Sequence, residues 1–295
     1  MTPNSIATQL LNVEEAILPQ YLYRIIPLER FIEALSTNLN SLVSPEVWTD
    51  PYEAAQLRTE LEVPMYVIKG GGCSTKPPDD MPHKVGGIAR TSTRVLTRIF
   101  CQCWSDLPES DAMWRLYSPT SAGVKLKVQS ACLLESLISG AGEGCPFLGA
   151  VEYLPQSDLE TLIQDAQTNF FIQRCPDLFQ KRRGEAWAKC VLRKRQPYIH
   201  ESEYRLILCH VEPNGQNGST SLFNYSFDFK ALVNQIELGP KTEDPDSLER
   251  TIRTIGFTGE VRRSRLYEPP NFNIRTTWPK QLKWINGTGN PSSNN

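Results

Sequence analysis

The sequence predicts a single α+β domain in which helices flank a mixed β-sheet that is split or strongly bent. Segments typical of strands outnumber those typical of helices, the two types do not alternate regularly, and no internal repeat is present. We place this domain at residues 20–268. A loosely ordered or helical lead over residues 1–19 precedes it, and a partly disordered tail over residues 269–295 follows it.

The composition is that of an ordinary soluble globular protein. The 295 residues are 40% hydrophobic and 22% charged, with a formal net charge of -2. Such a chain can bury a full core, and its charge gives no general affinity for nucleic acid or membranes. The N-terminus lacks a cationic start followed by an apolar run, and no stretch of about 18 apolar residues occurs. We therefore expect a cytoplasmic protein with no membrane partner.

The cysteines and histidines do not show the spacing of a metal site. The chain has eight cysteines and three histidines, but no C-x-x-C pair, and Cys101 and Cys103 flank a single residue. A chain of this length folds without disulfides. We therefore expect free thiols, most of them buried, and no metal.

Apolar periodicity predicts the elements of the first half of the chain. A strand at residues 21–26 leads into a helix that starts with Pro27, and a short strand follows at residues 41–44. A buried strand at residues 98–104 ends at Ser105. Ser110 or Asp111 then caps a short helix. That helix places Met113, Trp114 and Tyr117 on one side, either as core or as a ligand platform.

Two connecting segments in this half have distinct compositions. In the segment 49–53 (TDPYE), Asp50 is a helix cap, Pro51 the first helical residue, and Glu53 the residue that closes a capping box. A second role for a pocket-facing acid stays open there. Residues 69–93 are rich in Gly, Pro and polar residues, which predicts a flexible loop or lid.

The second half is predicted to contain further strands and two helices. We expect strands at residues 123–128, 147–154, 222–229, 235–238 and 261–266. A capping box at residues 157–160 opens one helix, and a second helix spans residues 247–255 with Gly256 as its C-cap. Residues 174–195 carry eight basic residues against two acids, which indicates either a solvated helix face or a surface for an anionic partner.

The segment 200–209 (HESEYRLILC) is predicted to be the central strand. With a side-chain period of two, Glu201, Glu203 and Arg205 share one face, and both faces turn apolar after Arg205. The two carboxylates and the guanidinium therefore lie at the mouth of the sheet. A Glu-x-Glu in that place is a candidate for catalysis, although pairing with other charges at the rim of the sheet explains it equally well.

A set of short motifs in chain order resembles a known bacterial family. They are Tyr23-Arg24, the segment 49–53, the CWS of 103–105 with the MW of 113–114, Tyr117 and Gly123, the E-x-E-Y-R of 201–205, and the LGP of 238–240. Over roughly residues 20–266 this set resembles the family called domain of unknown function 2971. Thr49 replaces the usual asparagine, and Trp104 replaces phenylalanine.

The order Arg24, Ser105, Glu201-x-Glu203 also resembles the arginine, serine and Glu-x-Glu signature of ADP-ribosyltransferases. That family has a split mixed sheet whose opening strand is followed by a helix. The resemblance implies that Arg24 holds a phosphate or ribose of NAD and that Ser105 helps to orient Glu203. Tyr117 or Trp114 would stack on the nicotinamide, and Asp50 and Arg205 complete the candidate binding residues.

The chemistry implied by this resemblance suits these groups. Cleavage of the nicotinamide–ribose bond passes through an oxocarbenium-like state, which an ionised Glu203 would stabilise, while Glu201 would deprotonate or position the acceptor. A pyrophosphate favours a bidentate arginine, and a cationic ring favours an aromatic face. The leading hypothesis is an NAD-consuming ADP-ribosyltransferase, such as a toxin or phage-defence effector, which modifies nucleic acid or protein near residues 174–195.

Two alternatives stay open at this stage. In the first, Arg24, Asp50, Glu203 and Arg205 form a structural charge network in a non-catalytic domain that binds a nucleotide or a partner. In the second, Asp50, Glu201 and Glu203 surround a divalent metal in a hydrolase or nuclease. Convergence of Arg24, Ser105 and Glu203 on one cleft would favour the ADP-ribosyltransferase hypothesis over both.

Overall fold

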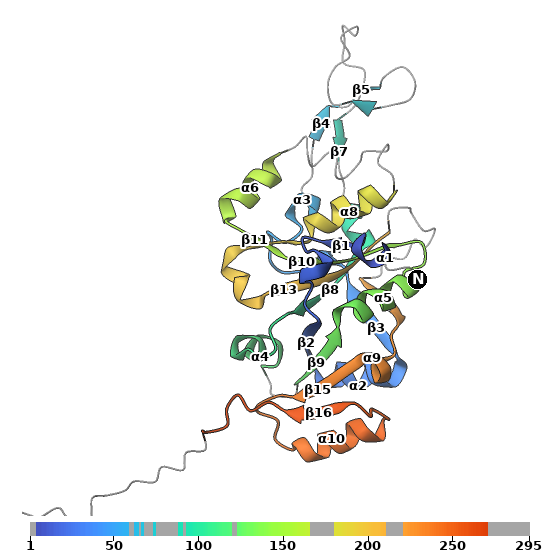
Figure 1. The fold of residues 1–295 in the computed structure, drawn as a ribbon. Coiled ribbons are helices and arrows are strands. Elements are labelled where there is room, and N and C mark those ends of the chain that lie inside the picture. The colour runs from blue at the N-terminus through green and yellow to red at the C-terminus, as the bar shows by residue number, and fades with distance from the viewer. Residues whose placement is uncertain are drawn as a thin grey trace, which may run out of the picture.

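The structure, a computed structural model, describes most of the chain. The described residues are 4–58, 62–64, 66–67, 73–74, 88–90, 93–119, 123–165, 180–210 and 221–270. Figure 1 shows the arrangement of their helices and strands. Most of the predicted loop at 69–93 and the tail from residue 271 lie outside these ranges. Two short strand pairs lie before and within this loop. They join β4 (Glu62–Pro64) to β7 (Ile88–Arg90) and β5 (Tyr66–Val67) to β6 (Cys73–Ser74).

A large mixed sheet dominates the fold, as the sequence predicts. In spatial order its strands are β1 (Leu10–Leu11), β10 (Cys145–Ala150), β13 (Glu203–Cys209), β8 (Ile99–Ser105), β2 (Tyr21–Pro27), β9 (Gly123–Gln129), β15 (Val233–Leu238) and β16 (Glu260–Arg263), with β3 (Leu39–Val43) and β14 (Leu222–Ser226) off this path. The β1–β10 and β15–β16 pairs are parallel, and the other pairs are antiparallel. A separate parallel pair joins β11 (Glu152–Leu154) to β12 (Arg193–Arg195).

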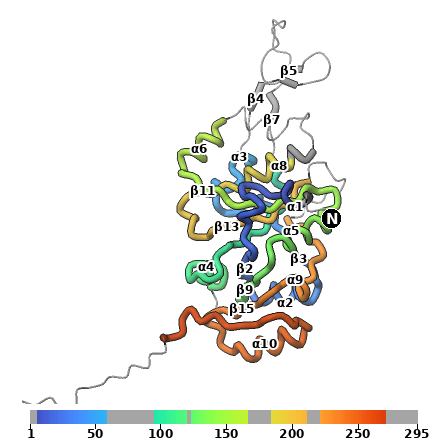
Figure 2. Tube along the Cα trace, viewed as in Figure 1, coloured from blue at the N-terminus to red at the C-terminus, as the bar shows by residue number. Residues whose placement is uncertain are grey.

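Helices lie around this sheet. They are α1 (Asn4–Ala7), α2 (Leu28–Thr37), α3 (Ala55–Arg58), α4 (Asp111–Tyr117), α5 (Ser130–Gly140), α6 (Gln156–Gln164), α8 (Gln180–Cys190), α9 (Phe229–Leu232) and α10 (Pro245–Thr254). A short 3₁₀ turn spans Pro45–Val47, and a longer 3₁₀ helix spans Gln196–Glu201. In Figures 1 and 2, α10 and β16 form one end of the described molecule, and α3, α6 and α8 lie toward the other.

The pairing between β2 and β8 is short, so most of β2 is not hydrogen-bonded to β8 beside the candidate site. The two strands share only the register pair Tyr23↔Ser105, whereas β8 pairs with β13 along its whole length. On its other edge, β2 pairs with β9 along its whole length, from Tyr21↔Gln129 to Pro27↔Gly123. The residues of β2 that follow Tyr23 are therefore not joined to β8, and β3 reaches β8 only through Val43↔Cys101.

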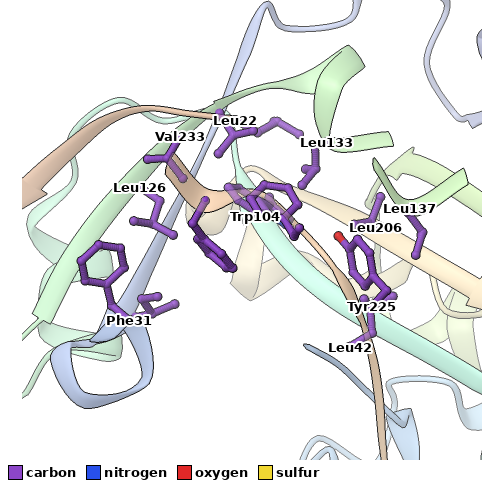
Figure 3. Close-up of a cluster of buried hydrophobic side chains, with 14 of the residues drawn as sticks. Leu22, Phe31, Leu42, Trp104, Leu126, Leu133, Leu137, Leu206, Tyr225 and Val233 are labelled. Carbon is purple, nitrogen blue, oxygen red and sulfur yellow. The ribbon is translucent and has the colours of Figure 1, made fainter. Parts of the chain in front are cut away.

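Two hydrophobic cores cover opposite faces of β13. Leu206 and Leu208 belong to the larger core, which also contains Trp104, Leu126 and Leu137 (Figure 3). Ile207 and Cys209 belong to the second core, with side chains of α3 and α8. Because successive side chains of a strand point to opposite faces, this alternation covers the sheet on both sides. The prediction that both faces turn apolar after Arg205 is therefore confirmed.

The N-terminal lead is more ordered than the sequence predicts. Residues 10–11 form β1, which pairs in parallel with β10, and Leu11 is buried. Figure 2 shows this N-terminal segment beside the strands of the sheet. Two leucines are too short a run for strand periodicity to detect, and the pairing partner lies far away in the sequence.

Three other local predictions need correction. The predicted elements do not include the helix α5, although its buried Leu133, Leu134 and Leu137 have helical spacing. The strand expected at 147–154 is divided at Val151 into β10 and β11. The capping box at 157–160 is wrong: α6 begins at Gln156 after Pro155, and the Ser157 hydroxyl donates to Asp158 Oδ1 at 3.0 Å.

Two other local predictions, the cap at Ser110 and the glycine after the last helix, are confirmed. The Ser110 hydroxyl accepts a hydrogen bond from Met113 N at 3.4 Å and caps α4. Gly256, with φ +100°, follows α10. The six cysteines whose side chains are described are free thiols, but only three of them, Cys101, Cys190 and Cys209, are buried, and the other three are half-buried. None of the described helices is both long and apolar enough to cross a membrane.

Candidate functional site

A cavity of about 610 Å³ opens where β2 leaves β8. Its wall is formed by β2, β8, α4, the start of β13 and the segment after β3. Six of the predicted site residues line it: Arg24, Ser105, Tyr117, Glu201, Glu203 and Arg205. The arginine of the first strand and the Glu-x-Glu of the late strand, which are almost 180 residues apart, thus reach the same cavity.

The backbone turns sharply between the two glutamates. Glu201 is the last residue of a 3₁₀ helix, Ser202 adopts a left-handed conformation with φ 43°, and Glu203 is the first residue of β13. The sequence instead predicts one continuous strand. Both carboxylates still face the cavity, because the left-handed residue turns the chain between them.

Hydrogen bonds hold this turn in place. The Ser105 hydroxyl donates to the Glu201 carbonyl at 2.7 Å, and the Glu203 amide donates to the Tyr153 hydroxyl at 2.9 Å. Ser105 also pairs with Glu203 in the strand register. Ser105 therefore binds the backbone of the Glu-x-Glu segment, and its role in orienting Glu203, which the family resemblance implies, stays a prediction.

Five buried charged side chains form one cluster on the cavity wall, which we call the charge cluster: Glu53, Lys194, Glu201, Glu203 and Arg205. Arg205 Nε lies 2.7 Å from Glu203 Oε1, and Arg205 Nη2 lies 2.6 Å from Glu53 Oε1. Lys194 Nζ lies 2.8 Å from Glu201 Oε2, 3.2 Å from Glu203 Oε2 and 3.3 Å from Glu53 Oε1. Three carboxylates are thus shared by two cations.

This pairing controls the ionisation of Glu203. Burial by itself would raise the pKa of Glu203, but the charge and hydrogen bonds of Arg205, together with the charge of Lys194, lower it to about 2. Burial works against the charged forms of Lys194 and Arg205 as well, yet the neighbouring carboxylates raise the pKa of both. Glu203 is therefore an ionised carboxylate at neutral pH.

Aromatic side chains enclose the charged end of the cavity. Trp48 lines it, and the guanidinium carbon of Arg205 lies 4.3 Å from the centre of the Trp48 ring. Tyr117, which is 37% exposed, places its hydroxyl 3.5 Å from Glu201 Oε2. Burial and the charge of Glu201 raise the pKa of Tyr117 well above its usual value, so its phenol stays protonated.

Arg24 differs from the other cations of the site. Among the described residues, no carboxylate pairs with it, and the titratable groups near it include the thiol of Cys103 and the phenols of Tyr117 and Tyr225. Burial lowers the pKa of Arg24, although a guanidinium remains charged. Arg24 also borders a second cavity of about 340 Å³, which shares Ile26, Pro27, Val43 and Trp104 with the first. An unpaired guanidinium between two cavities is suited to an anionic ligand.

Two predicted site residues lie elsewhere. Trp114 is 3% exposed, donates from Nε1 to Glu109 Oε1 at 2.6 Å, and packs its ring 5.5 Å from Lys125 Nζ. It does not line the cavity, so it belongs to the core and is not a ligand platform. Asp50 also lies outside the lining and pairs with Arg195 at 3.1 Å.

The segment 49–53 is only partly a helix cap. Asp50 Oδ1 accepts a hydrogen bond from the Tyr52 amide at 3.0 Å, as a cap does. The capping-box prediction for Glu53 is wrong, because α3 begins only at Ala55 and the Glu53 carboxylate binds Arg205. The acid of this segment that faces the pocket is Glu53, whereas the predicted binding residue is Asp50.

The described part of the basic segment is internally paired. Lys189 pairs with Glu185 at 2.7 Å, Arg195 pairs with Asp50, and Lys194 lies in the charge cluster. Residues 174–179 and the side chains of residues 181–183 lie outside what the structure describes. The basic side chains of residues 189–195 therefore pair with acids of the same fold, and a surface for an anionic partner in this segment stays a prediction. Sequence reasoning missed Lys194 because an alternating Arg-Lys-Arg is typical of solvent-facing segments.

The acids do not form a metal centre. Within the described ranges, no group of three or more His, Cys, Asp or Glu side chains is placed to hold a metal ion. Asp50 is separate from Glu201 and Glu203, and the latter two contact Lys194 and Arg205 at hydrogen-bond distance. A divalent cation would have to compete with these cations for the same oxygens.

In comparisons with known proteins, this chain shows weak similarity to a few solved structures. No family model matches the chain, so the resemblance to domain of unknown function 2971 gains no support. No curated protein matches it. Among solved structures, Thermus sp. 2.9 DarT in complex with carba-NAD+ matches with a TM-score of 0.36 and 12% identity, covering 84% of this chain and 97% of that chain.

Two further structures of the same protein also match. Thermus sp. 2.9 DarT in complex with NAD+ has a TM-score of 0.34 and 11% identity, and covers 84% of this chain and 96% of that chain. DarT in complex with ADP-ribosylated ssDNA has a TM-score of 0.36 and 11% identity, and covers 84% and 95% of the two chains. Likeness of this degree assigns no activity to this protein.

Proposed function

We propose that this protein is an NAD-consuming ADP-ribosyltransferase that acts in the cavity between β2 and β8. The observation that carries this proposal is the convergence of Arg24, Ser105 and Glu203 on one cavity. Arg24 supplies an unpaired cation for the pyrophosphate, and Glu203 supplies an ionised carboxylate for the ribose. The two adjoining cavities that share Arg24 offer room for an elongated ligand with an anionic centre.

Each group has a role in the proposed reaction. As the bond between nicotinamide and ribose breaks, nicotinamide leaves with the bonding electrons and positive charge develops on the ribose, where Glu203 stabilises it. Glu201 positions the acceptor nucleophile, whose proton it or solvent takes. Tyr117 offers an aromatic face for the nicotinamide, a role that Trp114 cannot share because it does not line the cavity.

The acceptor in this proposal is a nucleic acid or a protein. The described basic residues at 189–195 are paired within the fold, so they offer little free charge to a polyanion. An acceptor would reach Glu201 through the mouth of the cavity, where Tyr117 and Leu116 are exposed. A role as a toxin or phage-defence effector would follow from the identity of that acceptor.

A second candidate is a non-catalytic domain that binds a nucleotide. The charge cluster favours it, because Arg205 and Lys194 already satisfy Glu203 without a ligand. In that case Arg24 would still bind an anion, but Glu203 would only stabilise the fold. The two candidates therefore differ in whether NAD is broken and not in whether it is bound.

Release of labelled nicotinamide tests the proposal. The purified protein is incubated with NAD labelled in the nicotinamide ring, alone and with single-stranded DNA, RNA or protein. We expect nicotinamide release, and we expect Glu203→Gln to lower its rate by on the order of a hundredfold. Glu135→Gln, a change at an exposed glutamate of α5 outside the cavity, is the matched control.

Two outcomes would contradict the proposal. One is the absence of nicotinamide release with every acceptor, while NAD still binds, which would favour the non-catalytic candidate. The other is full activity in a folded Glu203→Gln protein. Melting temperatures of both variants show whether the folded state is retained.

A further inference from the structure

Lys194 contacts every carboxylate of the charge cluster. Its ammonium lies within 3.3 Å of Glu53, Glu201 and Glu203, and its side chain is only 9% exposed. Arg205, by contrast, pairs with Glu53 and Glu203 but has no described contact with Glu201. Lys194 is thus the one described cation that pairs with Glu201 and Glu203 together.

The two strand neighbours of Lys194 and an aromatic ring hold its side chain in place. It is the middle residue of β12, whose neighbours Arg193 and Arg195 pair outward with Glu152 at 3.8 Å and Asp50 at 3.1 Å. Its ammonium also lies 4.8 Å from the centre of the Tyr198 ring. Because side chains alternate along a strand, the outward pairs of Arg193 and Arg195 direct Lys194 to the cavity.

Without Lys194, the cluster would hold three carboxylates and one cation. Like charges within a buried site cannot all stay ionised, so at least one carboxylate would bind a proton in the neutral pH range. Glu201, which is 3% exposed, would lose its cation and keep the hydroxyl of Tyr117 as its other described polar neighbour. Glu203 would keep Arg205 as a partner.

We infer that Lys194 is a positioning residue that holds the carboxylates of Glu201 and Glu203 side by side for the reaction and balances their negative charge. This inference rests on the proposed ADP-ribosyltransferase function, and it assigns the lysine no contact with NAD. The charged groups that face Lys194 are Glu53, Glu201 and Glu203, with Arg205 beyond them, and the phenols near it are Tyr117, Tyr153 and Tyr198.

The pH dependence of nicotinamide release in Lys194→Met distinguishes this role from a structural one. We expect the acid limb of kcat/KM to move upward into the neutral range, to about pH 7, because a carboxylate without its cation protonates more easily. The variant should be at least about tenfold less active than the wild type at pH 6 and should recover at pH 9. Lys194→Arg keeps the charge and should keep the wild-type acid limb.

The matched control is Lys189→Met. Lys189 lies on α8, is 48% exposed and pairs with Glu185, so its loss should leave the pH profile unchanged. An equal loss of activity at every pH in Lys194→Met would overturn the inference, since it would indicate a structural role. A shifted acid limb in Lys194→Arg would overturn it as well.

A second measurement does not depend on activity. Carbon-13 labelling of the glutamate carboxyl groups allows their protonation to be followed by NMR between pH 4 and pH 9 in the folded wild-type and Lys194→Met proteins. We expect one additional carboxyl titration in this range in the variant. Absence of nicotinamide release in the wild type would refute the proposed function, whereas identical carboxyl titrations in the two proteins would refute the role of Lys194.

Discussion

At the scale of single residues, the site depends on buried charged side chains that pair with one another in the charge cluster. Glu203 is buried, and such an acid would normally prefer its neutral form. Two cations reverse this preference and hold the carboxylate ionised. The residue pattern predicts Glu201, Glu203 and Arg205 together, because period-two spacing is a local property. It could not predict Lys194 or Glu53, whose partners come from other parts of the chain.

The depressed pKa of Glu203 makes a testable contribution to stability. Its pKa falls from an ordinary 4.5 to about 2 on folding. A carboxylate whose pKa is lowered in the folded state stabilises the protein above its unfolded pKa, and this stabilisation is lost as the pH falls toward the folded pKa. The shift corresponds to about 3 kcal/mol near neutral pH, of which about 2 kcal/mol should be lost between pH 6 and pH 3.

Urea denaturation of the wild type and Glu203→Gln, repeated between pH 6 and pH 3, measures this contribution. The difference in unfolding free energy between the two proteins should shrink steadily as the pH falls. A difference that stays constant over this range would show that Glu203 does not have the lowered pKa.

At the scale of elements, the junction between the 3₁₀ helix Gln196–Glu201 and β13 brings the two glutamates together. Ser202 occupies the left-handed region there, with φ 43° and ψ 58°. A residue with a β-carbon rarely adopts this conformation, and sequence patterns do not reveal it when no glycine is present. This explains why the sequence predicts a straight strand from residue 200 and the structure shows a turn.

Substitution of Ser202 tests the importance of this junction. Ser202→Gly should fold normally and keep its activity, because glycine enters the left-handed region without strain. Ser202→Val should lose about 1–2 kcal/mol of unfolding free energy and release nicotinamide more slowly, because a β-branched residue strongly disfavours this conformation. The account of the junction would fail if the valine variant matched the glycine variant in both stability and rate.

At the scale of the whole molecule, the cavity lies where one sheet is shared by two hydrophobic cores. The larger core holds β2, β9 and β15, and the second holds α3 and α8 against β13. Because β2 and β8 pair only at Tyr23↔Ser105, the cavity opens beyond that point. Secure packing on both sides allows an opening in the sheet to persist without collapsing.

The mixed fold and most of its strands could be predicted from the sequence, because apolar periodicity is local. The strand β1 and the division of residues 147–154 could not, since they depend on distant pairing partners. The same limit applies to the site. Arg24 could be predicted on the first strand, but the absence of a described carboxylate beside it is visible only in three dimensions.

The most direct test of the central claim is the affinity for NAD, measured by calorimetry, in the wild type, Arg24→Gln and Arg250→Gln. Arg250 is exposed on α10 and does not line the cavity, so it serves as the control. We predict that the wild type and Arg250→Gln bind NAD equally and that Arg24→Gln binds it on the order of tenfold or more weakly, because a charge-assisted contact is lost. Equal binding by all three proteins, or no binding by the wild type, would contradict the account.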